Sequence, residues 1–413
     1  RRGCIQYGGA KRTLRFAGKG FQPQNLARGY YHDDELDKGI SALLKGRAHR
    51  RFDVAKLTAS TVRSCIIPEA GHKFVVADYS NVEGRGLAWL AGEETALDTF
   101  RAGLDIYCVT AGKMFGMEPD YIKKERKDLR QIGKACELGL GYAGGVGAFV
   151  QFAKNLGLDL VDMAKTMDGT FPDHIWAATA RGYEWARIQE AKRPPRPGEK
   201  DDRPSYILDK KVWRTCDAIK RMWRESHPET VAFWRDIEDA AMAAIRNPGK
   251  EFTAGPRGVK FSRNVETDNN NKVAGWWLRM TLPSGRVMSY PGVGLSVSKE
   301  TDEDGKVSTN VRIKYQGENQ LTRQWGFQYT YSGKLVENCT QALCRDLLAN
   351  ALLNVEANGY PIVLHVHDEI ICETPDLPEY NVAELERLMC ELPEWAEGFP
   401  LVAEGQELKR YAK

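Results

Sequence analysis

Two adjacent carboxylates, Asp368 and Glu369, interrupt an otherwise strongly apolar run between residues 361 and 372. The apolar residues on both sides predict two buried strands, with the acidic pair at the tip of a tight hairpin. Carboxylates held this close repel each other, and protonation of one or binding of a cation relieves the repulsion. Most such pairs lie in surface turns, but these flanks are too apolar for a solvated loop. The pair is therefore a candidate cation site.

A third carboxylate, Asp78, follows a short apolar strand predicted over residues 74–77 and precedes an apolar helix that includes residues 87–90. A divalent metal ion needs oxygen ligands from at least two places in the chain. The end of a buried strand is a suitable position from which Asp78 could meet Asp368. The alternative is that Asp78 only caps the following helix, and the residues alone leave both interpretations open.

Positive charge is concentrated between residues 123 and 134, and a glycine-rich stretch follows it. Side chains four residues apart are expected on one helix face: Arg130, Lys134, Leu138 and Tyr142. About twelve residues of helix span about 18 Å, enough to reach from a triphosphate to a base pair. Gly139 and Gly141 weaken a helix, which we expect where a flat surface must approach closely. The alternative is a solvated basic face.

Composition limits the possible classes of protein. The 413 residues are enough for two or three structural units, and the 42% of hydrophobic residues support a large core. No apolar run approaches the ~20 residues of a membrane helix, and no signal peptide opens the chain. The nine cysteines contain no C-x-x-C pair, so we expect free thiols in a reducing cytosol. Because the net charge is only +3, any nucleic-acid contact must come from a local patch.

The remaining sequence predicts helices first and strands later. Residues 156–235 have mainly helical spacing, interrupted by a polar, proline-rich run near 190–204. Residues 250–332 favour strands, with turns at 282–286 and at Asp304-Gly305. A long helix is expected over 333–357 and a short one near 381–392, on either side of the acidic hairpin. The chain has no starting Met, and we expect it to be the C-terminal part of a longer product.

Three motifs in order resemble those of the A-family DNA polymerases. Asp78-Tyr79-Ser80-x-x-Glu83-x-Arg85 resembles motif A, Arg130-x-x-x-Lys134 with Leu138 and Tyr142 resembles motif B, and Val366-His367-Asp368-Glu369 resembles motif C. Supporting matches are Arg15, Gln24-Asn25 and Gln341. The resemblance covers nearly all of the chain and is closest to phage-type members. Some positions depart from the usual family residues: Asn81, Tyr107, Leu138, Ala143 and Glu337.

The resemblance implies an α+β fold, the right-hand polymerase fold, with an antiparallel palm sheet and mainly helical fingers. Residues 1–92 would be the first part of the palm, 93–290 the fingers with an insertion near 190–204, and 291–413 the second part of the palm. The thumb, which precedes the palm in such enzymes, is not recognised here. The implied partners are primer-template DNA, dNTPs and an N-terminal thumb or exonuclease region or a processivity factor, in the cytosol of a bacterium or phage-infected host.

The implied reaction is attack of a primer 3′-hydroxyl on the α-phosphate of a dNTP, assisted by two Mg²⁺ ions, with Mn²⁺ as a substitute. Asp78, Asp368 and the Tyr79 carbonyl would hold the ions, and Glu369 would support them. Further residues would form the nucleotide site: Arg130 and Lys134 at the phosphates, Glu83 under the sugar, Tyr142 at the template base, and Tyr107, Leu138 and Ser80. Others would contact DNA: Arg15, Gln24, Asn25, Arg85, Gln341 and His367.

Two other functions share part of this pattern. A single-subunit RNA polymerase has the same two aspartates, the lysine and the tyrosine, but Glu83, Arg15 and Gln24-Asn25 argue against it. A non-catalytic nucleic-acid-binding remnant would not need Asp78, Asp368, Arg130 and Lys134 intact. Comparing dNTP with NTP incorporation on a primed template would distinguish a DNA polymerase from an RNA polymerase. Primer extension with Mg²⁺ and dNTPs would distinguish an active enzyme from a non-catalytic remnant.

Overall fold

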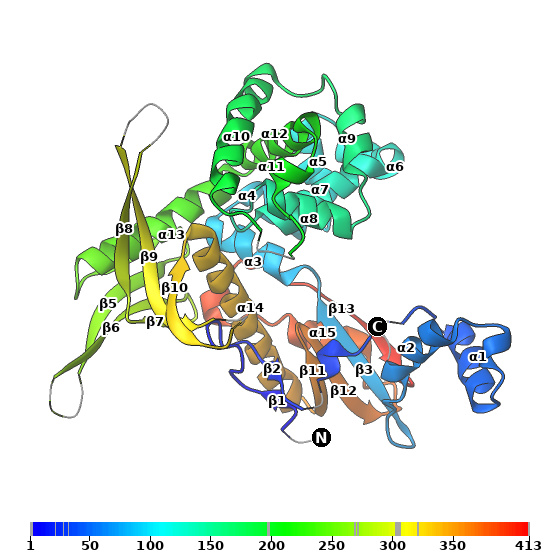
Figure 1. Ribbon diagram of the computed structural model, residues 1–413. Coiled ribbons are helices and arrows are strands. Elements are labelled where there is room, and N and C mark those ends of the chain that lie inside the picture. Colours follow the sequence, from blue (N-terminus) through cyan, green and yellow to red (C-terminus); the bar gives the residue numbers. More distant parts are fainter. Residues whose placement is uncertain are drawn as a thin grey trace. The chain divides into compact units, whose positions relative to one another are not determined.

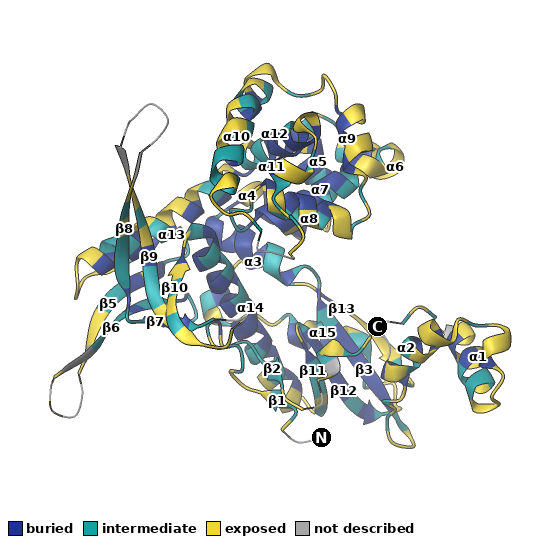
Figure 2. Cartoon of the chain, viewed as in Figure 1, coloured by how far each residue is buried: buried dark blue, intermediate teal, exposed yellow. Residues whose placement is uncertain are grey.

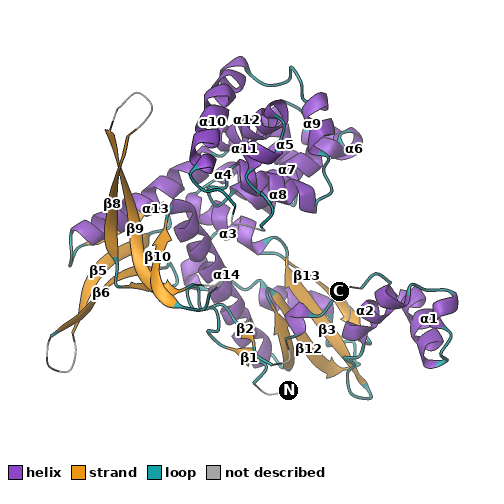
Figure 3. Cartoon of the chain, viewed as in Figure 1, coloured by secondary structure: helices purple, strands orange, loops and turns teal. Residues whose placement is uncertain are grey.

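The chain forms two compact units, which are described separately. The computed structural model describes residues 3–20, 22–27, 29–31, 33–195, 199–267, 270, 272–301, 307–319 and 322–411. The first unit comprises Arg1–Glu83 and Gln341–Lys413, and the second comprises Gly84–Thr340. Figure 1 labels the elements, and Figure 3 separates helices from strands. The predicted α+β class is confirmed, since every strand pair in the described part of the chain is antiparallel.

A four-stranded antiparallel sheet in the order β11-β12-β3-β13 forms the centre of the first unit (Figure 1). Its strands are β3 (His72–Tyr79), β11 (Ile362–Val366), β12 (Glu369–Pro375) and β13 (Ala403–Leu408). Strand β3 is buried along almost its whole length because it lies between two other strands, which explains its unbroken apolar run. One core cluster of this sheet contains Phe74, Val76, Val366, Ile371 and Tyr411. The predicted hairpin at residues 361–372 is confirmed.

Shorter elements complete the first unit. Helix α15 (Val382–Met389) packs on β3 and β13 and begins at Asn381, whose side chain accepts a hydrogen bond from the Glu384 N–H. The others are β1 (Ile5–Gln6), β2 (Ala17–Gly18), η1 (Pro23–Asn25), α1 (Asp33–Leu44), η2 (Ala48–Arg50), α2 (Val54–Ser64) and η3 (Glu394–Ala396). Helices α3 (Val82–Ala91) and α14 (Ser332–Ala357) each belong to both units along their length.

The second unit begins with helices. Their bounds are α4 (Glu94–Arg101), α5 (Ile106–Phe115), α6 (Pro119–Glu125), α7 (Lys127–Leu140), α8 (Val146–Asn155), α9 (Leu160–Thr166), α10 (Asp173–Ala191), α11 (Pro204–Ile207), α12 (Lys210–Ser226) and α13 (Pro228–Arg246). The side chains of Asp105, Asp159 and Asp209 cap three of these helices by accepting N–H groups of the first turn. The predicted core positions of α13, Phe233, Trp234 and Ile237, are buried.

Two antiparallel sheets follow in the second unit. One has the order β4-β5-β6-β7, with β4 (Glu251–Ala254), β5 (Val259–Thr267), β6 (Val273–Thr281) and β7 (Val287–Pro291). The other has the order β10-β9-β8, with β8 (Gly294–Thr301), β9 (Val307–Glu318) and β10 (Trp325–Thr330). The turn predicted at 282–286 joins β6 to β7. The turn predicted at Asp304-Gly305 lies outside the described residues.

The basic helix is shorter than predicted. It is divided at Arg126 into α6 and α7, and α7 ends at Leu140, so Tyr142 lies in the turn that follows. The glycines of this region serve packing within the unit. A Cβ on Gly139 would lie 3.1 Å from the Phe152 ring, and a Cβ on Gly141 would lie 2.8 Å from Leu87. The expected close approach at both glycines is confirmed, and the approaching groups are side chains of the same unit.

None of the helices in the described part of the chain is both long and apolar enough to span a membrane. All nine cysteines are free thiols.

Candidate active site

The two predicted aspartates come to the same end of the four-stranded sheet. In the register of β3 with β12, Asp78 lies opposite Glu369, and the Tyr79 N–H donates a hydrogen bond to the Asp368 carbonyl at 3.2 Å. Asp78 is the second-last residue of β3, and Asp368 lies in the turn between β11 and β12. Both residues are half-buried, so one carboxylate on a strand and one in a turn lie at the same accessible end of this sheet.

Glu369 differs from its neighbour because it is buried. It is 2% exposed, and its carboxylate accepts a hydrogen bond of 2.7 Å from the Tyr411 hydroxyl, which is also buried. Burial, followed by the charge of Glu369, raises the pKa of Tyr411, so this hydroxyl stays protonated and remains a donor. Sequence reasoning did not single out Tyr411, because 42 residues separate it from Glu369 and no spacing pattern joins them.

The turn that carries Asp368 has an uncommon backbone. His367 has φ +55°, in the left-handed region that few side chains adopt, and its side chain is exposed. Two residues earlier, His365 packs edge-on against Phe16 with ring centroids 4.6 Å apart. Burial lowers the pKa of His365 to about 4, so this ring is neutral near pH 7. His365 is a packed strand residue, as expected, whereas His367 faces solvent.

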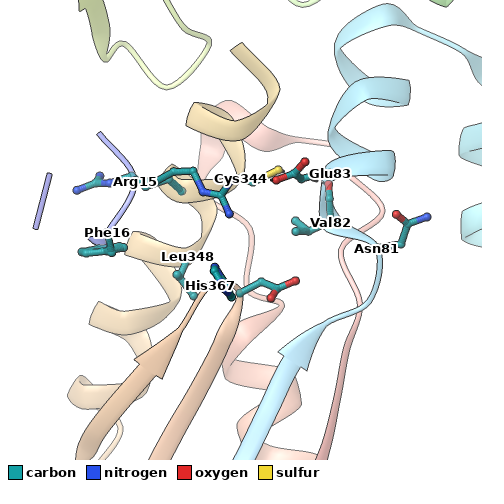
Figure 4. Close-up of a pocket in the computed structure, with 10 residues that line it drawn as sticks. Arg15, Phe16, Asn81, Val82, Glu83, Cys344, Leu348 and His367 are labelled. Carbon is teal, nitrogen blue, oxygen red and sulfur yellow. Dashed lines mark hydrogen bonds and ion pairs between the residues drawn. The ribbon is translucent and has the colours of Figure 1, made fainter. Parts of the chain in front are cut away.

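A pocket of the first unit lies beside the aspartate (Figure 4). It is lined by Arg15, Phe16, Asn81, Val82, Glu83, Cys344, Arg345, Leu348, His367 and Asp368. Glu83, in the first turn of α3, accepts a hydrogen bond from Arg15 Nη1 at 3.2 Å, and both side chains are about one-third exposed. Glu83, predicted at the nucleotide site, and Arg15, predicted to contact DNA, therefore form an ion pair with each other. The candidate metal ligand Asp368 lines the same pocket.

Arg345 is a further residue of this pocket that sequence reasoning placed only on a polar helix face. It is 7% exposed, and its guanidinium lies over the rings of Tyr7 (4.4 Å) and Phe16 (4.9 Å). Its position one helical turn after Gln341 could have drawn attention to it. Gln341 itself is half-buried on α14, while Gln24 and Asn25 lie in η1, with Asn25 exposed and bonded to Gln22.

The acidic end of the sheet suits magnesium bound together with substrate oxygens. Among the described residues, no group of three or more His, Cys, Asp or Glu side chains is arranged to hold a metal by itself. Mg²⁺ is commonly held by one or two carboxylates plus substrate phosphates, in contrast to an all-protein cage. Asp78 and Asp368 would match that number of carboxylates, and the hydrogen bond from Tyr411 to Glu369 keeps the third carboxylate inside the core.

A separate cationic cluster lies in the second unit. Arg130 on α7 donates Nε to Asp105 Oδ2 at 2.7 Å, and its guanidinium lies 5.4 Å from the centre of the Tyr107 ring. Lys134, one turn later, lies 5.8 Å from the same ring. The hydrogen bond that Arg130 donates to Asp105 raises the pKa of Arg130, so the side chain is a permanent cation. Three predicted nucleotide-site residues, Arg130, Lys134 and Tyr107, thus lie together. Asp105 was missed, although it is a typical helix cap two residues before Tyr107.

An ionic network around Glu137, two turns after Arg130, also holds α7 against α5. Glu137 Oε1 accepts hydrogen bonds from Thr110 at 2.8 Å and from Trp223 Nε1 at 2.9 Å, and it lies 3.2 Å from His227 Nε2. Burial opposes the charge of both groups. The Glu137 carboxylate nevertheless raises the pKa of His227, and His227 lowers the pKa of Glu137. The network joins α7 to α5, to α12 and to the residue that begins α13.

The other predicted residues occupy different surroundings. The Tyr79 side chain is buried and its hydroxyl donates to the Met389 carbonyl, so only its backbone could reach a ligand. The Ser80 N–H donates to the Val402 carbonyl. Arg85 is buried over the Phe100 ring at 4.5 Å, which weighs against direct contact with DNA. Leu138 is exposed on α7, and Tyr142 is half-buried.

Comparisons with known proteins agree with the motifs. Residues 52–173 match the model of DNA polymerase family A. The DNA polymerase of Bacillus phage SP02 is 31% identical over 418 residues, covering 100% of this chain and 52% of the phage protein. DNA polymerase I of Chloroflexus aurantiacus is 37% identical over 106 residues, covering 26% of this chain and 10% of that protein. The chain thus spans about half the length of the phage relative.

One solved structure supports the fold. The POL domain of Pol1 from M. smegmatis, solved in complex with DNA primer-template and dNTP, matches with a TM-score of 0.50 at 16% sequence identity. The match covers 98% of this chain and 47% of that one. At this identity the likeness establishes the fold of a polymerase domain, and function has to be argued from the site.

Proposed function

We propose that this chain, a relative of the family A DNA polymerases, is a template-directed DNA polymerase that adds dNTPs to a primer 3′-hydroxyl and releases pyrophosphate. The observation that carries the proposal is the register that brings Asp78 and the Asp368 turn to one end of one sheet. One carboxylate on a buried strand and one in the tight turn between two strands are suited to a metal-assisted phosphoryl transfer, which depends on precise positioning.

Asp78, Asp368 and the Tyr79 carbonyl would hold two Mg²⁺ ions, or Mn²⁺ in their place. Such ions, when bound, neutralise charge on the reacting phosphates and favour ionisation of the primer hydroxyl. The task of the protein residues is to hold the two carboxylates in place. Glu369, fixed by the Tyr411 hydroxyl, would support the turn that carries Asp368 without acting as a ligand.

Arg130 and Lys134 would bind the triphosphate through charge-assisted hydrogen bonds, and Lys134 could donate a proton to the leaving pyrophosphate. Their common contact with Tyr107 supports a shared task. Arg130 is already ion-paired with Asp105, so a phosphate would have to share or displace that carboxylate. Tyr142 would approach the template base. We assign the sheet of the first unit to the palm and the helices around α7 to the fingers.

Glu83 would exclude a ribose 2′-hydroxyl, and Arg15 would hold it in place through their 3.2 Å contact. Arg15, Gln24, Asn25, Gln341 and His367 would contact primer-template DNA, where minor-groove contacts depend little on sequence. In this proposal the pocket of Figure 4 excludes a ribose 2′-hydroxyl and contacts the primer end.

The test is to remove the charge of each aspartate while keeping its shape. Asp78→Asn and Asp368→Asn should each lower primer extension with Mg²⁺ by roughly a thousandfold, while binding of a primer-template duplex stays measurable. Glu379→Gln is the matched control, because it removes one negative charge from an exposed residue of the same unit, beyond the end of β12 that is distant from Asp368. Near-normal turnover in either aspartate variant would show that the metal assignment is wrong.

A further inference from the structure

The three-stranded sheet β8–β9–β10 has two chemically different faces. One face packs inward: Ile313 and Thr330, which are partners across β9 and β10, are both buried. Tyr315 on the same face meets the buried Tyr290 edge-on, with ring centroids 5.2 Å apart. Because side chains alternate along a strand, the residues between these positions must point to the other face.

The outer face of the edge strand β10 carries a row of aromatic rings. Trp325, Phe327 and Tyr329 alternate with less exposed residues and are 64%, 57% and 51% exposed. The yellow segments of β10 in Figure 2 show these exposed positions. Tyr331, directly after the strand, is 56% exposed. Exposed aromatic side chains in a contiguous row mark an interaction surface more often than a single exposed ring does.

Cations from the neighbouring strand lie among these rings. Arg312 lies 4.6 Å from the centre of the Tyr329 ring, and Lys314 lies 5.0 Å from that of Phe327. Two acidic residues belong to the same face by register, Glu300 on β8 and Glu318 on β9, and Glu318 is ion-paired with Arg323 at 3.5 Å. The face therefore combines flat, accessible rings with an excess of positive charge.

Packing of the sheet does not by itself require this arrangement. Cross-strand pairs of a cation and a ring do stabilise a sheet. One ring is enough for such a pair, whereas β10 exposes three. Exposing a row of large rings leaves apolar surface in water, which is unfavourable unless a ligand covers it. A ligand that offers both stackable planes and regular negative charge fits this face best.

We propose that the outer face of β8–β9–β10 binds single-stranded DNA, with bases stacked on Phe327, Tyr329 and Trp325 and phosphates at Arg312 and Lys314. Aromatic platforms with adjacent cations are the usual means of binding unpaired strands without reading their sequence. The identification of the ligand as DNA rests on the proposed polymerase function, for which an unpaired template strand is a substrate.

The experiment measures binding of a fluorescent thymidine oligonucleotide to the full chain by anisotropy. It is done with a metal chelator and without dNTP, so that it does not depend on catalysis. Replacing both Phe327→Ser and Tyr329→Ser should weaken binding by roughly tenfold for each ring removed. A variant with Phe327→Tyr and Tyr329→Phe keeps an aromatic ring at each position and should bind the oligonucleotide as tightly as the original chain. Val297→Ala is the matched control, because Val297 is 63% exposed on β8 but belongs to the opposite face of the sheet.

Equal affinity of the original chain and the serine variant would overturn the proposal and leave this face as a surface for a protein partner. Failure of the original chain to bind the oligonucleotide would overturn it as well. An unchanged circular dichroism spectrum of the serine variant, together with full affinity in the conservative variant, excludes misfolding as the cause of a loss of affinity. If the oligonucleotide binds as expected but the chain does not extend a primer, only the proposed catalytic function is contradicted.

Discussion

At the scale of single residues, the Tyr411 hydroxyl holds a buried carboxylate. Tyr411→Phe removes the donor from Glu369 and leaves that oxygen in a buried place, so the free energy of unfolding should fall by about 1.5–3 kcal/mol. Tyr360→Phe is the matched control, because the Tyr360 hydroxyl bonds to neutral backbone groups, donating to carbonyls and accepting from the Asn381 N–H, and its loss should cost about 1 kcal/mol. Denaturant unfolding measures both. Equal losses of unfolding free energy in the two variants would mean that the charge of Glu369 does not strengthen its hydrogen bond with Tyr411.

Glu83 gives a second prediction at this scale. Glu83→Ala opens the space beside Arg15, so incorporation of ribonucleotides relative to deoxynucleotides should rise on the order of tenfold to a hundredfold. Glu83→Gln keeps the size and removes the charge, so it should keep most of the discrimination if exclusion is steric. Single-nucleotide extension with dNTPs and NTPs measures the ratio. An unchanged ratio in Glu83→Ala would remove Glu83 from this role.

At the scale of elements, the Glu137–His227 pair predicts how stability depends on pH. The raised pKa of His227 means that its contribution is complete below the ordinary value of 6.5 and is lost as pH rises through the raised value. The lowered pKa of Glu137 gives the opposite limit, because its contribution is lost as pH falls through that value. The free energy of unfolding of the second unit should therefore be highest at pH values between the lowered pKa of Glu137 and the raised pKa of His227.

Glu137→Gln tests this network. The variant should be less stable by about 1–3 kcal/mol below the raised pKa of His227, because the buried imidazolium loses its partner. The loss of stability on the alkaline side should then become smaller than in the original chain. Thermal unfolding over a pH series measures both effects, with Glu184→Gln as control, since its ion pair with Lys210 is exposed. Parallel pH profiles would contradict the assignment.

The elements also show where sequence patterns succeed. The strands around Asp78 and Asp368 were predictable because a buried strand needs an unbroken apolar run, and few other structures do. The end of α7 at Leu140 was not predictable from four-residue spacing, because that spacing continues to Tyr142. The partners that pack closely on Gly139 and Gly141, Phe152 and Leu87, are distant in sequence. Partners such as Tyr411 for Glu369 depend on a contact between distant segments, which no local spacing encodes.

At the scale of the whole molecule, a net charge of only +3 on 413 residues gives little general attraction to DNA. Affinity must then come from local cations, each of which releases counterions when it neutralises a phosphate. The three motifs could be identified in the sequence because they are short and chemically specific. The outer face of β8–β9–β10 could not, because only the strand register shows that Arg312 and Lys314 lie beside the rings of Tyr329 and Phe327.

The local cations of this face determine how single-strand binding should depend on salt. For a thymidine oligonucleotide, the logarithm of the binding constant should fall with the logarithm of salt concentration by about 0.7 for each phosphate neutralised. Replacing both Arg312→Ala and Lys314→Ala should therefore reduce the slope by about 1.4. Lys165→Ala on α9 is the control, because this exposed cation is paired with Asp162 and should leave the slope unchanged. A slope that is the same in all three proteins would mean that the phosphates are bound elsewhere on the chain.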